Sequence, residues 1–139
     1  MRKYQLDLIQ SKAVYDHCKR HIQIKHCYNN VFEVVTDYIS NFRTGKWQVA
    51  YGYTEVMTGL YCRHCFILDE HGKVIDPTIY AQSEQQDREY YVMAVFDDVD
   101  EYFDAIEKEH YMPALERHLQ EQDNKACQWA SENGIIFIR

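Results

Sequence analysis

The chain has few residues that break regular structure. Its 139 residues include only two prolines and five glycines, and no linker or internal repeat interrupts them. A chain of this length with 46% apolar residues can bury one sizeable core, unlike a disordered tail. We therefore expect a single domain over residues 1–139.

Positive charge and long apolar runs are also scarce. Fifteen Lys and Arg against 22 Asp and Glu give a net charge of −7 at pH 7. This balance disfavours nucleic-acid binding, because a phosphate backbone is bound through a basic face. No apolar run approaches a membrane span, and residues 1–8 lack the apolar centre of a signal peptide. We expect a cytoplasmic protein that binds neither nucleic acid nor membranes.

The cysteines support neither a disulfide framework nor a zinc site. Their number, five, is odd, and in a cytoplasmic protein we expect free thiols. Cys62 and Cys65 flank His64, but a structural zinc site usually needs a second ligand pair. On a strand, positions 62 and 65 also point to opposite faces. His17 and His21 lie one helical turn apart without completing a ligand set, so we expect no metal and no other cofactor.

Apolar periodicity predicts an α+β domain in which N-terminal helices pack on a small antiparallel sheet, followed by C-terminal helices. Asp98 is the expected N-cap of one C-terminal helix, with Glu101 three residues on. Another is expected to begin around Pro113 and to end before Gly134. The predicted helices are 11–22, 28–41, one from 98 and 112–132, and the predicted strands are 47–53, 61–69, 73–76, 89–96 and 135–138.

A thiol, a histidine and a carboxylate stand at informative places in this pattern. Cys27 comes just before the second predicted helix, His64 lies on a strand, and Asp76 ends the next strand. A free thiol, with a pKa near ~8.5, is mostly protonated at neutral pH, and a helix N-terminus or a neighbouring imidazolium favours the thiolate. Cys27 is placed to use both. The imidazole must in turn be oriented by a polar group such as a carboxylate.

The hairpin around Gly72 determines whether the histidine and the carboxylate meet. Residues equidistant from the turn pair with each other, which places Asp76 opposite about Leu68 or Asp69. That position is some way along the strand from His64. Contact between the two side chains therefore needs a twist, a bulge or a different register.

Four segments resemble small bacterial and phage proteins of the papain-like and transglutaminase-like superfamily of cysteine hydrolases. The segments are CYNN at 27–30, YGY at 51–53, HCF at 64–66 and GKVIDPT at 72–78. Such proteins commonly carry Cys-x-x-Asn at a helix start, a strand like His-Ala-Trp, and a strand Gly-x-Val-x-Asp-Pro-Thr. The resemblance covers about residues 25–79, and it departs from the pattern where Cys-Phe replaces Ala-Trp after the histidine.

The resemblance implies a papain-like fold and a catalytic triad. Cys27 would be the nucleophile, His64 the general base and Asp76 the residue that orients the histidine. Asn30 would be a structural or site-lining residue, and the Cys27 backbone N–H or the Gln23 side chain would stabilise an oxyanion. The implied activity is that of a thiol hydrolase or acyltransferase on an amide of a protein or peptide substrate. That amide is a peptide bond, an isopeptide bond or a Gln or Asn side chain.

A second function remains open at this stage. Cys27 before a buried helix is compatible with a core residue, His64 with a hydrogen-bonded core histidine, and Asp76 with a turn residue. The chain would then be a non-catalytic protein-binding or inhibitory module, for which a phage origin is one option. Its acidic surface, with many of the twelve tyrosines, would meet a basic protein partner.

Overall fold

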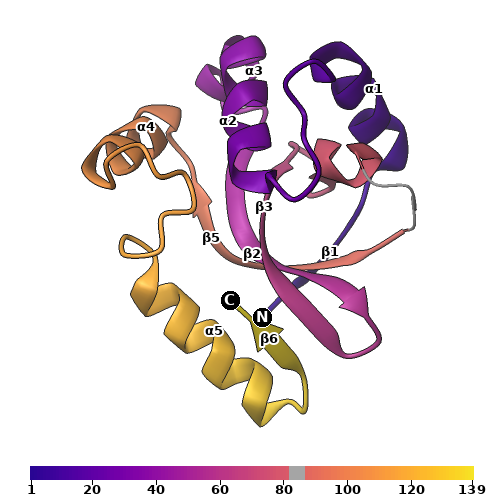
Figure 1. The fold of residues 1–139 in the computed structure, drawn as a ribbon, viewed down its shortest axis with the longest axis vertical. Helices are drawn as coiled ribbons and strands as arrows, with labels where there is room; N and C mark the ends of the chain where they lie inside the picture. The colour runs from indigo at the N-terminus through magenta and orange to yellow at the C-terminus, as the bar shows by residue number, and fades with distance from the viewer. Residues whose placement is uncertain (82–86) are drawn as a thin grey trace.

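The computed structural model describes residues 1–81 and 87–139, and within them it confirms the α+β class. Helices α1, α2 and α3 gather at one end of a twisted sheet, and α5 lies at the other end (Figure 1). In chain order the elements are β1 (Lys3–Gln5), α1 (Leu8–Cys18), α2 (Cys27–Asp37), α3 (Ile39–Arg43), β2 (Gln48–Met57), β3 (Leu60–Leu68), β4 (Val74–Ile75), the 3₁₀ helix η1 (Pro77–Ala81), β5 (Glu89–Phe96), α4 (Val99–Lys108), α5 (Gln120–Glu132) and β6 (Ile136–Ile138).

The strands form one sheet in the order β1-β5-β2-β3-β4, and β6 also pairs with β3. The pairs among β1 to β5 are antiparallel, as predicted. The pairing of β6 with β3 is parallel, which corrects the expectation of a purely antiparallel sheet. A parallel neighbour needs a long connection, and here α4 and α5 lie between the two strands in the chain. Strand β1 had not been predicted from the sequence.

The N-terminal helices differ in their bounds from the prediction. α1 begins at Leu8, three residues before the predicted start, because the Asp7 side chain accepts a hydrogen bond from Gln10 N at 2.9 Å. The helix predicted over 28–41 is two helices, with a break at Tyr38, where φ is −116°. α2 remains the central helix, with Val31 and its apolar neighbours fully buried.

The helix predicted over 112–132 is shorter than expected. Only Gln120–Glu132 is helical, and Pro113 lies in an irregular segment rather than in a first helical turn. Three residues of that segment, His110, Tyr111 and Leu115, have positive φ values that an α-helix cannot contain.

Two predictions for the C-terminal helices hold. Asp98 caps α4, although its side chain accepts from Asp100 N (2.9 Å) rather than from the backbone of Glu101. Gly134 follows the end of α5 in the left-handed region, with φ of 69°. None of the helices in residues 1–81 and 87–139 combines the length and apolarity that a membrane span requires.

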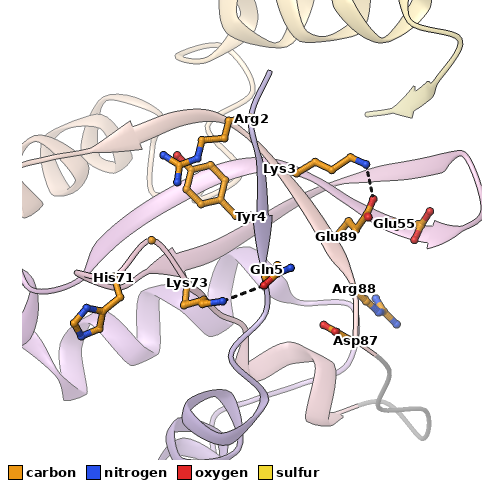
Figure 2. Close-up of a pocket in the computed structure, with 11 residues that line it drawn as sticks. Arg2, Lys3, Tyr4, Gln5, Glu55, His71, Lys73, Asp87, Arg88 and Glu89 are labelled. Carbon is orange, nitrogen blue, oxygen red and sulfur yellow. Dashed lines mark hydrogen bonds and ion pairs between the residues drawn. The ribbon is translucent and has the colours of Figure 1, made fainter.

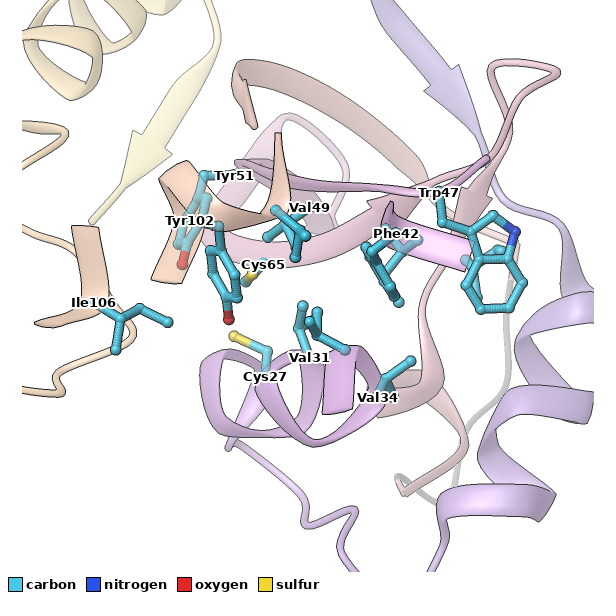
Figure 3. Packing of buried hydrophobic residues seen from close by; sticks show 14 of the residues in the cluster. Cys27, Val31, Val34, Phe42, Trp47, Val49, Tyr51, Cys65, Tyr102 and Ile106 are labelled. Carbon is cyan, nitrogen blue, oxygen red and sulfur yellow. The ribbon is translucent and has the colours of Figure 1, made fainter. Parts of the chain in front are cut away.

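The main core lies between α2, α4 and one face of the sheet. Cys27, Val31 and Val34 extend from α2 on the side that packs against Tyr51 and Cys65 of the sheet (Figure 3). A second cluster occupies the opposite face and contains Phe66, Leu68, Val74 and Tyr90, among others. The triad candidates lie where these two clusters approach each other, at the start of α2.

Candidate active site

Cys27 is the first residue of α2, which begins one residue before the predicted start at 28, and it is 7% exposed. The first backbone N–H groups of a helix have no partner within the helix. His26, at the N-cap position of α2, makes no side-chain hydrogen bond to them, whereas Asp7 and Asp98 cap α1 and α4. The partial positive charge of the α2 N-terminus is therefore not offset by its cap residue.

His64 lies on a stretch of β3 whose outer edge is open. β4 pairs with β3 at Ile67 and Leu68, and β6 pairs with it at Leu60–Cys62. Between these two pairings, the described strands pair with β3 only on its β2 side. α2 packs against β3 and begins near this open stretch (Figure 1).

His64 and Asp76 are in contact. Nε2 of His64 lies 2.7 Å from Oδ2 of Asp76, and the two side chains are 11% and 1% exposed. The imidazole is thus held through Nε2, which leaves Nδ1 as the nitrogen available to the Cys27 sulfur.

The hairpin register explains this contact and corrects the predicted one. Asp69 N donates to Lys73 O, and Leu68 pairs with Val74, so the turn is centred on His71 rather than on Gly72. Continued along the strand, this register places Asp76 opposite Phe66, two residues from the predicted partner. His64 is the next residue of β3 on that face, within diagonal reach of Asp76. No bulge in β3 is needed.

Several groups hold the Asp76 carboxylate in place. Tyr90 Oη donates to Oδ2 at 2.7 Å, and Thr78 N donates to Oδ1 at 3.2 Å. The Asp76 backbone N–H donates to Ser11 Oγ at 2.9 Å. Burial raises the pKa of Asp76, but the His64 charge and the hydrogen bonds from His64 and Tyr90 outweigh it and lower that pKa. Asp76 is therefore a carboxylate at neutral pH.

The same contacts decide the charge of His64. Burial lowers its pKa, whereas the Asp76 carboxylate and the Cys27 sulfur raise it, each through charge and through hydrogen bonding. The net result is a pKa raised from 6.5 to about 10. An imidazolium is thus favoured at neutral pH, and Cys27 lies close enough to be one of its partners.

Asn30 and Gln23 form one structural unit beside the thiol. The fully buried Asn30 side chain accepts from Gln23 N at 2.9 Å and donates to Gln23 O at 2.7 Å. Its Nδ2 also donates to Thr78 Oγ1 at 3.0 Å. Asn30 thereby joins the segment before α2 to the segment that carries Asp76. The Gln23 side chain is exposed, and its role at an oxyanion stays a prediction.

The other cysteines sit in different surroundings. Burial raises the pKa of Cys65 well above its usual range. Burial, together with a 3.3 Å hydrogen bond to Asp37, raises the pKa of Cys18 to about 12. Neither thiol suits nucleophilic chemistry at neutral pH. Within residues 1–81 and 87–139, no three His, Cys, Asp or Glu side chains gather in a way that could hold a metal ion.

Tyr90 and Ser11 are not among the residues that the sequence predicts for the site. Both act on Asp76 from distant elements, β5 and α1, and no local motif marks them. Thr78 lies within the Asp-Pro-Thr segment, so the motif itself was a signal for it. Comparisons of the chain with protein-family models, with curated proteins and with solved structures found no match.

Proposed function

We propose that this α+β protein is a papain-like thiol hydrolase or acyltransferase with Cys27, His64 and Asp76 as its triad. The observation that carries the proposal is the 2.7 Å contact between His64 and Asp76, beside a cysteine at an uncapped helix start. An imidazolium stabilised by a carboxylate is the group that favours a neighbouring thiolate. The protein or peptide substrate would contribute a peptide, isopeptide or Gln or Asn side-chain amide.

The mechanism follows from the roles of these groups. The Cys27 thiolate attacks the amide carbonyl carbon, and the resulting oxyanion is stabilised by first-turn N–H groups of α2. The C–N bond then breaks, and the His64 imidazolium gives its proton to the leaving amine, which forms a thioester. Water or an amine next attacks the thioester and loses a proton to His64. The thiolate is released and the pair returns to its starting state.

The competing function is that of a non-catalytic binding module. It is supported by the packing of Cys27, which is buried in line with Val31 and Val34 at helical spacing. In that case the thiol fills space in the core and the His64–Asp76 pair stabilises the hairpin.

Cysteine alkylation separates the two functions. Iodoacetamide modification of each cysteine is followed by mass spectrometry from pH 5 to pH 9, on the wild type and on His64→Ala. If the protein is an enzyme, Cys27 should be alkylated faster near pH 6–7 than the half-buried Cys62 and Cys127. The His64→Ala change should then remove this difference in rate. Cys27 that reacts only when the protein unfolds would leave the binding module as the better account.

A further inference from the structure

A pocket of about 490 Å³ is lined by residues of α2, β3 and α5, together with residues before and after α5. Two of its residues are the immediate neighbours of triad members, because Tyr28 follows Cys27 and Arg63 precedes His64. The pocket is lined by Tyr28, Arg63, Glu116, Arg117, Gln120, Asp123 and Arg139. Arg63 and His64 point to opposite faces of β3, so it is Tyr28, which interacts electrostatically with Cys27, that brings the pocket within reach of a substrate held at the thiol.

The inner wall of the pocket contains a buried guanidinium. The Arg63 side chain is 4% exposed, and its Nε donates to both carboxylate oxygens of Asp123 at 3.0 Å. Nη1 donates to Tyr28 Oη at 3.0 Å and to Ala114 O at 2.7 Å. Nη2 is buried and has no hydrogen-bond partner in residues 1–81 and 87–139. A buried hydrogen-bond donor without a partner lowers the stability of a folded protein. It marks a place where a ligand could supply the acceptor.

The outer wall adds positive charge. Arg117 and Arg139 are exposed, and Glu116 is the acidic residue beside them. Asp123 already compensates Arg63, so the guanidinium of Arg117 is the exposed cation at the rim that faces no carboxylate of the inner wall. Arg117 forms no ion pair with any described residue, and Arg139 donates to Asn124.

A larger pocket, of about 600 Å³, shows the contrast. It lies along β1 and the start of β5, and its described lining includes no residue of α2, the helix that begins at Cys27 (Figure 2). Its lysines are already engaged, since Lys3 pairs with Glu89 at 3.2 Å and Lys73 donates to Gln5 at 3.0 Å. Of these two pockets, the smaller one is placed to bind part of a substrate held at Cys27.

We propose that the pocket around Arg63 and Arg117 is a subsite that binds a carboxylate of the acyl substrate. This inference rests on the proposed thiol chemistry and adds a specificity to it: an acidic side chain or a C-terminal carboxylate near the scissile amide. A guanidinium presents paired donors that match the two oxygens of a carboxylate. The exposed arginines attract the anion, and Tyr28 and Arg63 fix its distance from Cys27.

Electrophilic amino-acid probes test the subsite. Three chloroacetyl compounds are compared for their rate of alkylation at Cys27: the amide of glutamine, the amide of glutamate, and glutamine with a free α-carboxylate. They carry no charge, a side-chain carboxylate and a terminal carboxylate, respectively. Each is measured on the wild type, on Arg117→Gln and Arg139→Gln, and on Arg43→Gln. Arg43 is the control because it is an exposed arginine that pairs with Asp100, away from the pocket.

We expect at least one carboxylate probe to react several-fold faster than the neutral one on the wild type. Arg117→Gln should lower that ratio by about threefold, Arg139→Gln should lower it to a similar degree, and Arg43→Gln should leave it unchanged. An equal ratio of carboxylate-probe to neutral-probe rates in wild type and Arg117→Gln would overturn the subsite, even where His64 gives both carboxylate probes some advantage.

Iodoacetamide separates a failure of the subsite from a failure of the proposed thiol chemistry. If iodoacetamide alkylates Cys27 no faster than Cys62, the proposed thiol chemistry is wrong, and the proposed subsite is then wrong as well.

Discussion

The imidazole of His64 and the carboxylate of Asp76 meet at 2.7 Å although the pairing of β3 with β4 ends at Ile67 and Ile75, short of both residues. Asp76 is the first residue after β4, where the chain turns into η1. The carboxylate therefore extends diagonally along β3 from the end of its own strand. This arrangement makes Asp76 the main group that favours the charged form of His64, ahead of Cys27.

Replacing Asp76 by asparagine should return His64 to neutrality at physiological pH. The pKa of His64, raised to about 10 in the wild type, should fall toward 6.5, because burial continues to oppose the imidazolium. Titration of the His64 ring by NMR measures this directly. An imidazole that still titrates near pH 10 in Asp76→Asn would show that Asp76 is not its main partner.

The same pair predicts how stability changes with pH. A raised pKa stabilises the folded protein fully below the ordinary value of 6.5, and this contribution is lost as the pH rises through about 10. Wild type should therefore lose its advantage over His64→Gln across that interval. Urea unfolding of both proteins at pH 6, 8 and 10 provides the test, and a difference that grows with pH would contradict it.

Tyr90→Phe should destabilise the protein by about 1–2 kcal/mol, because it removes a buried hydrogen bond to the Asp76 carboxylate. The matched control is Tyr80→Phe, whose hydroxyl donates to Leu8 O at an exposed position and should cost less than about 0.5 kcal/mol. Urea unfolding of both variants measures the difference, and equal costs would count against a buried role for Tyr90.

Asn30→Ala should cost about 3 kcal/mol, because three hydrogen bonds to Gln23 and Thr78 disappear and buried partners are left without an acceptor or donor. Its neighbour Asn29 is exposed, and Asn29→Ala should change the free energy of unfolding by less than about 0.5 kcal/mol. Chemical denaturation distinguishes these values. A small effect at Asn30 would mean that the segment before α2 is held by other contacts.

Gly52→Ala should prevent normal folding. A Cβ at Gly52 would lie 1.8 Å from the backbone oxygen of Tyr91, which cannot move without breaking the pairing of β2 with β5. We expect a loss of more than about 4 kcal/mol. Gly59→Ala is the comparison: its Cβ meets open space, and its φ of 79° should cost only about 1 kcal/mol. Soluble yield and thermal unfolding by circular dichroism report both, and a well-folded Gly52→Ala would refute the close approach.

Local patterns in the sequence were sufficient for elements that depend on near neighbours. The strand predicted over 89–96 has the bounds of β5, and α2 begins at Cys27, one residue before its predicted start. The hairpin was predicted, but its register was not, because Asp69 decides the register through its side chain. Its Oδ1 accepts from His71 N and Lys73 N, which centres the turn one residue earlier than Gly72 suggests.

Contacts between distant segments account for what the sequence did not reveal. Tyr90 reaches Asp76 across the sheet, and nothing in its neighbours distinguishes it from the other eleven tyrosines. The predicted helix over 112–132 failed for a similar reason. Tyr51 Oη donates to Pro113 O, and Arg63 donates to Ala114 O, so the sheet binds carbonyl groups that a continuous helix would use itself.

Arg63 links the triad region to the C-terminal part of the chain. It joins α5 through Asp123, the segment before α5 through Ala114, and the start of α2 through Tyr28. Separating α5 from the sheet would leave a guanidinium in the interior without its counter-charge, a state that costs several kcal/mol. The helix that carries Cys27 and the last helix of the chain are therefore expected to melt in one cooperative transition, so that a thiol competent for chemistry exists only in the fully assembled protein.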